Sequence, residues 1–219
     1  MEPDNPLLDE YVLRRTGKSD PRICFVPTAS GDSPDYVRRF YLAFRRFQCW
    51  PSHLPLWNPP TADLRSFVSD KDVIYVGGGN TKGMLALWRA WGLDAIFREA
   101  WERGAVLAGI SAGAICWFEE GLTDSIPGTL SPLKCLGFLE GSACPHYDGE
   151  AERRPTYLGA VALGALGAGY AIQDGAALVF EGTALREAVS SRAGAKALRV
   201  ERDAGSGARE LEVPMRYLG

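Results

Sequence analysis

The feature that most constrains the fold is a unit of apolar strand, polar or glycine-rich turn and helical pattern, found three times in the first half of the chain. The apolar runs, each with the turn that follows it, are residues 22–26 with 27–32, 72–76 with 77–81, and 105–110 with 111–113. Strands that alternate with helices are typical of a parallel sheet with both faces covered. We therefore predict an α/β fold with a doubly wound, mostly parallel sheet and helices on both faces. Ligands bind beyond the carboxyl ends of such strands, so the three turns should lie on one functional rim.

The rest of the chain continues this organisation without an internal repeat or a linker. The pattern predicts a short helix over residues 6–16, a strand over 176–180 and a C-terminal β-hairpin over 197–217. Residues 158–172 form the longest uncharged apolar run. Because a membrane span needs about 18 residues or more, we expect a buried helix there. We predict one domain over residues 1–219.

Composition and charge exclude several functional classes. Apolar residues make up 46% and charged residues 23% of the chain, which is ordinary for a globular protein and excludes collagen-like and strongly disordered chains. A net charge of −3 indicates no surface for nucleic acid or an anionic membrane, so the expected partner is a small molecule or peptide. Five cysteines without a C-x-x-C pair predict reduced thiols, and we expect no metal or cofactor. The first residues contain no signal-like segment, which predicts a cytoplasmic location.

Residues 109–113 read Gly-Ile-Ser-Ala-Gly and match the G-x-S-x-G pattern of a nucleophile elbow. The motif lies directly after an apolar strand and directly before a helical stretch, which is the context that gives it meaning. A nucleophile on so tight a turn has strained backbone angles and needs small neighbours, and Ala112 and Gly113 meet that need. The alternative is a small-residue turn that only packs a helix against a strand. We predict Ser111 as a catalytic nucleophile.

A serine nucleophile needs a general base, and the chain contains two histidines. His53 lies in a proline-bounded segment where a surface or packing role is expected, so we predict His146 as the base. The base in turn needs an acceptor for its second ring nitrogen. We predict Asp124, on a loop beyond the helix that leaves the elbow, with Glu119 or Glu120 on that helix as the alternatives.

An acyl-transfer enzyme also needs hydrogen-bond donors for the oxyanion that develops in its transition state. The glycines at residues 77–79 can supply one peptide N–H with no side chain in the way, and the N–H of Ala112 can supply a second. Phosphate binding is a competing use of a glycine-rich loop, but the residues around Lys82 lack the G-x-x-x-x-G-K-[ST] spacing. A tight packing turn is the other alternative.

Three stretches together resemble the peptidase E family of serine peptidases, which includes aspartyl dipeptidases and is related to cyanophycinase. They are Val-Gly-Gly-Gly-Asn-Thr at residues 76–81, Gly-Ile-Ser-Ala-Gly-Ala at 109–114 and Pro-His-Tyr at 145–147. The similarity extends to residues 27–32 and 174–182. This resemblance implies a flavodoxin-like fold similar to the class I glutamine amidotransferases, with a serine nucleophile and no metal.

The same resemblance implies roles for particular residues. Ser111 and His146 match the nucleophile and base of the family. Gly78 or Gly79, together with Ala112, matches its oxyanion hole. The implied reaction is hydrolysis of short peptides, of the dipeptidase or exopeptidase type, through an acyl-enzyme.

The chain departs from the aspartyl dipeptidases at the acid. Those enzymes carry Asn-Asp-x-Pro, so alignment on Pro127 places Ser125 at the acid position, and a shift of one residue restores Asp124. Strict specificity for aspartate is therefore not expected. Arg153 and Arg154 could meet a substrate carboxylate, or form a solvated basic pair.

Two other functions stay open on the sequence alone. One is an amidotransferase-like scaffold that binds without catalysing a reaction. The other is a small-ester hydrolase of the α/β-hydrolase type, although His146 follows Ser111 too closely for that fold. Trp88, Trp91 and Trp101, with the tail hairpin, could form a homodimer interface or belong to the core.

Overall fold

The computed structural model describes residues 1–2, 4–203, 205 and 207–219 of the chain. These residues form two compact units, Met1–Gly113 and Ala114–Gly219. The single domain over residues 1–219 stays a prediction.

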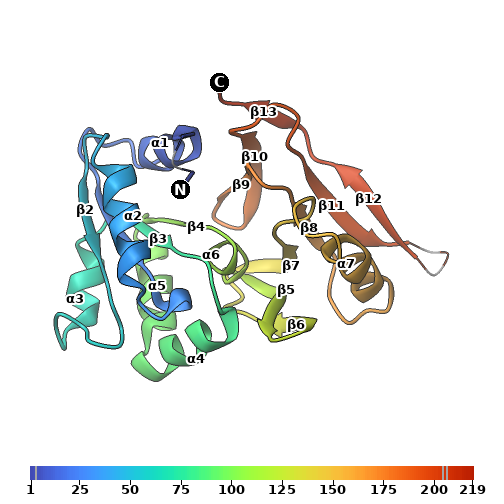
Figure 1. Cartoon of the computed structure of the whole chain (residues 1–219), viewed down its shortest axis with the longest axis horizontal. Coiled ribbons are helices and arrows are strands. Elements are labelled where there is room, and N and C mark those ends of the chain that lie inside the picture. The colour runs from blue at the N-terminus through green and yellow to red at the C-terminus, as the bar shows by residue number, and fades with distance from the viewer. Residues whose placement is uncertain (3, 204, 206) are drawn as a thin grey trace. The chain divides into compact units, whose positions relative to one another are not determined.

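The first unit is built around a four-stranded parallel sheet with the strand order β2-β1-β3-β4 (Figure 1). Its strands are β1 (Arg22–Val26), β2 (Trp50–His53), β3 (Val73–Val76) and β4 (Val106–Gly109). β1, β3 and β4 lie within the three apolar runs of the sequence, which confirms those predictions. The side chains of β3 and of the last four residues of β1 are buried. A strand buried on both faces has a continuous apolar sequence, and this made the runs recognisable.

Helices cover both faces of this sheet. They are α1 (Leu7–Arg14), the 3₁₀ turn η1 (Thr28–Ser30), α2 (Pro34–Phe44), α3 (Leu64–Ser69), α4 (Thr81–Trp91) and α5 (Leu93–Glu102). Ile23 and Phe25 of β1 pack in one cluster with Phe40 and Phe44 of α2. In the sheet, β2 lies on one side of β1, whereas β3 and β4 lie on the other side, so the direction of strand addition reverses after β2. Right-handed crossovers therefore place α3, α4 and α5 on the face opposite α2, as a doubly wound sheet requires.

Polar side chains begin the helices that follow two of the turns. At the start of α2, Ser33 Oγ accepts a hydrogen bond from Tyr36 N at 3.4 Å. At the start of α4, Asn80 Oδ1 accepts one from Gly83 N at 2.8 Å. Such caps satisfy N–H groups that have no partner within the helix. The backbone N–H of Asn80 also donates to Ala29 O at 2.7 Å, so the turns after β1 and β3 are in direct contact.

The tryptophan-rich segment contributes to the core of the first unit. Trp88 is fully buried, and its ring lies edge-on to Phe97 with 5.0 Å between ring centroids. Its indole N–H donates to Thr28 Oγ1 at 3.1 Å. Trp91 is 42% exposed. Trp88 is therefore a core residue, and the homodimer stays a prediction.

The second unit contains a six-stranded sheet and a three-stranded sheet. The six-stranded sheet has the order β12-β11-β8-β7-β5-β6, and the three-stranded sheet has the order β13-β10-β9 (Figure 1). The strands are β5 (Phe118–Ile126), β6 (Thr129–Lys134), β7 (Leu139–Cys144), β8 (Gly169–Ile172), β9 (Ala176–Glu181), β10 (Ala184–Ser190), β11 (Ala197–Arg202), β12 (Ala208–Glu212) and β13 (Met215–Tyr217). β5, β7 and β8 run parallel to one another at the centre of the larger sheet. Helix α7 (Arg153–Ala162) packs on β11 and β12.

The C-terminal hairpin is confirmed over residues 197–212, whereas Met215–Tyr217 forms β13 and pairs with β10 of the other sheet. β11 and β12 pair antiparallel, with a register that runs from Leu198 opposite Glu212 to Arg202 opposite Ala208. Ser206, in the turn that the sequence predicts for this hairpin, lies outside the described residues. The strand predicted over residues 176–180 is confirmed as β9.

The helix predicted to leave the elbow is wrong over most of its length. Helix α6 (Ala112–Ile115) has four residues, and β5 begins at Phe118, so Glu119 and Glu120 lie in a strand. Gly121 of the same strand pairs with Leu133 of β6 and Ala143 of β7. Pairing on both edges of β5 stabilises the strand and outweighs the helical pattern of the local sequence.

The buried helix predicted over residues 158–172 is also wrong. The run splits into the end of α7, a turn and the strand β8. Gly164 has a φ of 73°, the left-handed conformation that commonly follows a helix. A Cβ at Gly169 would lie 1.9 Å from Ser142 O, so only glycine lets β8 approach β7 this closely.

Both units combine helices with sheets, the sheet of the first unit is parallel throughout, and three parallel pairs occur in the second, so the predicted α/β class is confirmed. In the part of the chain that the structure describes, no helix is long and apolar enough to cross a membrane.

Candidate active site

Ser111 lies between β4 and α6, at the strand–turn–helix position that its motif predicts. Its φ is 54°, a left-handed conformation that costs a non-glycine residue about 1–2 kcal/mol and persists only where the surrounding structure enforces it. Two backbone hydrogen bonds enforce it here. Gly113 N donates to Ile110 O at 2.9 Å, and Ile110 N donates to Val76 O at 3.1 Å. The turn therefore has the strained backbone expected of a nucleophile elbow.

The glycines of the motif are required because backbone atoms occupy the space of a side chain. A Cβ at Gly109 would lie 2.4 Å from Gly113 O, and a Cβ at Gly113 would lie 2.2 Å from Val76 O. The glycine-rich turn after β3 approaches from the other side. A Cβ at Gly78 would lie 3.1 Å from Ser111 Cβ and 3.7 Å from its Oγ. Small residues thus hold the Ser111 turn against β3 and bring Gly78 to the serine.

The three predicted oxyanion donors have different surroundings. The N–H of Gly78 donates to Tyr36 Oη at 3.1 Å. Burial raises the pKa of this tyrosine, although the hydrogen bond from Gly78 opposes the shift. Gly79 has a φ of 136°, and a Cβ there would lie 2.2 Å from Ala29 O. Ala112 is buried as the first residue of α6.

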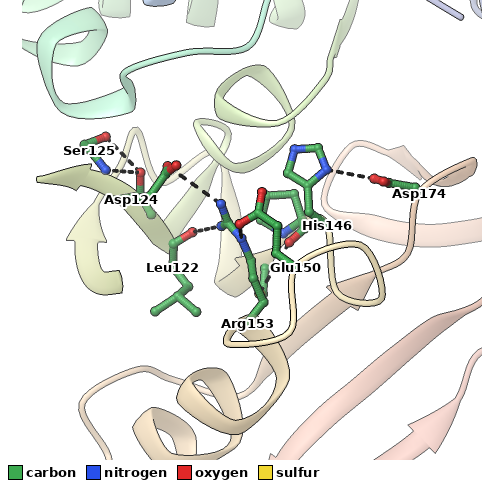
Figure 2. A network of polar contacts seen from close by, with 10 residues as sticks. Leu122, Asp124, Ser125, His146, Glu150, Arg153 and Asp174 are labelled. Atoms are coloured by element: carbon green, nitrogen blue, oxygen red, sulfur yellow. Dashed lines mark hydrogen bonds and ion pairs between the residues drawn. The ribbon is translucent and has the colours of Figure 1, made fainter. Parts of the chain in front are cut away.

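His146 forms a close pair with a carboxylate in the second unit (Figure 2). Its Nδ1 lies 2.7 Å from Oδ1 of Asp174. His146 is two residues beyond β7 and Asp174 is two residues beyond β8, and Cys144 pairs with Ala171 in the parallel register of these strands. Because neighbouring parallel strands end at the same sheet edge, the two side chains meet there. The φ of His146 is 54°, so this histidine also has a strained backbone.

The segment that follows His146 also positions Asp174. Asp148 Oδ1 accepts a hydrogen bond from the backbone N–H of Asp174 at 2.9 Å. A Cβ at Gly149 would lie 2.8 Å from Asp174 Oδ2, so the absence of a side chain leaves room for the carboxylate. The His146 and Asp174 side chains are 32% and 39% exposed. The pair is fixed by its own loops and remains open to solvent.

Asp124, the predicted acid, pairs with a different residue. It lies in β5 rather than on a loop, its side chain is 66% exposed, and its Oδ1 is 3.6 Å from Nη2 of Arg153 (Figure 2). Arg153 is buried, its Nε donates to Glu150 at 2.7 Å, and its Nη1 donates to Leu122 O at 3.2 Å. The prediction that Asp124 contacts His146 is therefore replaced by an ion pair between Asp124 and Arg153. The solvated role considered for Arg153 is wrong, because its side chain is buried.

The two alternative acids support neighbouring loops. Glu119 Oε2 accepts a hydrogen bond from Gly141 N at 2.8 Å, and Glu120 Oε2 accepts one from Gly167 N at 3.1 Å. Both glutamates lie in β5, and each carboxylate accepts a hydrogen bond from a backbone N–H of a neighbouring segment.

His53 has the packing role expected from its sequence context. It ends β2, and its Nδ1 lies 2.9 Å from Tyr41 Oη. Burial lowers the pKa of His53, and the charge of Asp32 opposes that shift. Among the described residues, no group of three or more His, Cys, Asp or Glu side chains is arranged to hold a metal ion.

Comparison with known proteins decides the family. The sequence model of peptidase family S51 matches residues 1–188. This chain belongs to peptidase family S51. The resemblance to peptidase E is thereby confirmed, and the protein is a peptidase, a hydrolase of peptide bonds.

Two relatives of this S51 peptidase are described as uncharacterized peptidases. The chain is 59% identical to the uncharacterized peptidase YgaJ of Bacillus subtilis over 219 residues, which cover 100% of this chain and 94% of the relative. It is 26% identical over 151 residues to an uncharacterized peptidase of Listeria monocytogenes, covering 65% of this chain and 72% of the other. A solved peptidase from an acI-B1 Actinobacterium shares the fold, with a TM-score of 0.68 and 18% identity over 95% of this chain and 88% of its own.

Sequence reasoning missed the contact between Asp174 and His146, although a signal for it was available. Asp174 is followed by Gly175, and an Asp-Gly pair soon after an apolar run, here separated from it by Gln173, is a turn signal that marks the end of a strand. Reading residues 158–172 as one helix concealed that strand. Had β8 been recognised, the rule that ligands bind beyond parallel strand ends would have placed Asp174 beside His146.

Proposed function

We propose that this S51 peptidase hydrolyses short peptides with Ser111 as nucleophile, His146 as general base and Asp174 as the acid that orients the base. The observation that carries the proposal is the 2.7 Å contact between His146 Nδ1 and Asp174 Oδ1. A carboxylate at this distance fixes the imidazole tautomer that leaves Nε2 able to accept a proton, and it stabilises the imidazolium that forms.

The reaction begins when Ser111 Oγ attacks the carbonyl carbon of the scissile bond and His146 Nε2 takes the hydroxyl proton. The carbonyl oxygen becomes an oxyanion. When the tetrahedral intermediate collapses, the carbon–nitrogen bond breaks, and the proton on His146 passes to the leaving amine. Water then attacks the acyl-enzyme with the same histidine as base, which releases the carboxylic acid and restores Ser111.

Backbone N–H groups stabilise the oxyanion in this proposal. Because the Gly78 N–H donates to Tyr36, we assign the donors to Gly79 and Ala112. Each such donor contributes about 3–4 kcal/mol to the lowering of the barrier.

The substrate class rests on the resemblance to the peptidase E family. Its members cleave dipeptides, which supports di- and tripeptides as the first substrates to examine. Arg153 forms an ion pair with Asp124 and does not need a substrate carboxylate as its partner, so we propose no aspartate specificity through either residue. The cytoplasmic location expected from the sequence stays a prediction.

The test is product analysis by mass spectrometry on a panel of di- and tripeptides that includes Asp-Xaa, with wild type and Ser111→Ala compared. We expect cleavage by the wild type that is lost in the variant, with the product masses giving the trimmed end. A fluorophosphonate should label Ser111, and the label should disappear in His146→Ala. Equal product from both proteins, or no product from either, would overturn the proposal for these substrates and favour an inert scaffold. Turnover of activated esters alone would favour an esterase.

A further inference from the structure

Strand β12 of the C-terminal hairpin contacts the segment that directly follows His146. Tyr147 Oη donates a hydrogen bond to Glu210 Oε1 at 2.6 Å. Nη2 of Arg154, in the first turn of α7, donates to Glu210 Oε2 at 2.5 Å. Both carboxylate oxygens of Glu210 are therefore engaged by residues close in sequence to the proposed base.

Tyr147 is held at three points, and it adjoins a residue with a strained backbone. Its side chain is buried, its ring lies edge-on to Tyr157 at 6.2 Å, and its backbone N–H donates to Ile172 O at 3.1 Å. Glu210 supplies the third point. A non-glycine residue such as His146 keeps a φ of 54° only where its neighbours over-determine the conformation. The anchors on Tyr147 provide that constraint on the C-terminal side of the histidine.

Glu210 is an ionised acceptor for the hydroxyl of Tyr147. The Glu210 side chain is 17% exposed. Burial alone would raise its pKa, but the hydrogen bonds from Arg154 and Tyr147 outweigh burial and keep the pKa below its ordinary value. The carboxylate is thus an ionised acceptor, and hydrogen bonds to ionised groups are stronger than neutral ones. Without it, the buried Tyr147 hydroxyl would lose its charged acceptor.

We propose that Glu210, on the C-terminal hairpin, is a positioning residue for His146 and acts through Tyr147. The hairpin lies beyond residue 188, where the match to the S51 family model ends. This inference rests on the proposed function, because it assigns Glu210 the task of holding the base in that reaction. In this proposal Glu210 acts through Tyr147 and takes no part in the chemical steps.

The same strand supplies a matched control. Glu212 lies two residues from Glu210 in β12, its side chain is 67% exposed, and it pairs with Lys196. Truncation of Glu212 removes an equal charge and an ion pair from the same strand without touching Tyr147. The comparison of Glu210→Ala with Glu212→Ala therefore separates the contacts of Glu210 with Tyr147 and Arg154 from general effects of charge or strand stability, and Tyr147→Phe removes the Tyr147 contact alone.

The kinetic test uses full-length protein and the best peptide of the panel. We expect Glu210→Ala and Tyr147→Phe each to lower kcat by about 10- to 100-fold, since small displacements of a catalytic group have effects of this size, with KM unchanged within about twofold. The double variant should be no slower than the slower single variant, because all three variants lose the same contact between Tyr147 and Glu210. Glu210→Gln keeps an oxygen acceptor and should recover most of the rate, and Glu212→Ala should match wild type.

A second readout does not depend on activity. The chain has two histidines, His53 and His146, so ¹⁵N-labelled imidazoles give two sets of signals. We expect Glu210→Ala to shift or broaden the signals of His146 and to leave those of His53, while Glu212→Ala moves neither. If the His146 signals in Glu210→Ala match those in the Glu212→Ala control, the positioning role is overturned whatever the value of kcat. If the wild type cleaves no peptide, the proposed function fails, whereas unchanged His146 signals refute the positioning role alone. Should Glu210→Ala not fold, Glu210→Gln and Tyr147→Phe carry the same comparison.

Discussion

Replacement of Gly113 by alanine should displace the Ser111 turn from β3 and destabilise the first unit by about 3 kcal/mol. The new Cβ would lie 2.2 Å from Val76 O, whereas ordinary contact begins at 3.4 Å, so the backbone must move by about 1.2 Å. Val76 O also accepts the hydrogen bond from Ile110 N. Overpacking of this kind costs about 1–3 kcal/mol, and the weakened hydrogen bond adds about 1 kcal/mol.

The measurement is urea unfolding at pH 7 together with peptide turnover. We expect a midpoint shift equivalent to about 3 kcal/mol and a loss of activity of about 100-fold, because Ser111, the proposed nucleophile, moves with the turn. Gly159→Ala is the control. Gly159 lies within α7, a Cβ there meets no heavy atom within 4 Å, and the change should stabilise the protein by about 0.5–1 kcal/mol. A Gly113→Ala variant within 1 kcal/mol of wild type and fully active would refute the packing argument for the elbow.

Further predictions follow from other contacts. Burial raises the pKa of Cys24 and Cys144 to about 12, so iodoacetamide at pH 8 should modify the half-buried Cys49 first. Peptide mapping by mass spectrometry measures the order of modification, and early adducts on Cys24 would contradict this expectation. The folded-state pKa of Glu210 lies below its ordinary value, so its stabilisation is present above the unfolded pKa and lost as pH falls through the folded pKa. The stability gap between wild type and Glu210→Gln should therefore stay constant from neutral pH down to about one unit above the ordinary pKa of 4.5 and shrink as the pH falls further, and a gap that grows in acid in urea titrations would refute the assignment. Ser142→Ala removes bonds at 2.8 Å to Tyr157 Oη and 2.6 Å to a backbone carbonyl, so it should cost about 1–3 kcal/mol in the same assay; a cost below about 0.5 kcal/mol would argue against a buried network.

The first unit was largely predictable because two of its strands, β1 and β3, are almost wholly buried. Val73–Val76 and Arg22–Val26 stand out as continuous apolar runs, and the G-x-S-x-G spacing is local, so Ser111 and its flanking glycines follow from sequence alone. These features need no knowledge of distant contacts.

The contact between His146 and Asp174 could not be predicted in the same way, because it is set by strand register. Asp174 lies 28 residues from His146 in sequence, and the two meet only because β7 and β8 pair in parallel. That pairing depends on Gly169, whose missing side chain leaves room for Ser142 O. Asp124 was a reasonable choice by proximity in sequence, but the pairing of β5 with its neighbours directs it to Arg153. Long-range pairing, rather than local propensity, determined the outcome.

The most direct test of the account compares two carboxamide variants, Asp174→Asn and Asp124→Asn, by kcat/KM on the best peptide substrate. Asparagine keeps the size of each side chain and removes its charge. The account predicts a fall of about 10³- to 10⁴-fold for Asp174→Asn, because His146 loses the acceptor that fixes its tautomer, and a value within about threefold of wild type for Asp124→Asn. A large loss in Asp124→Asn with normal activity in Asp174→Asn would contradict it.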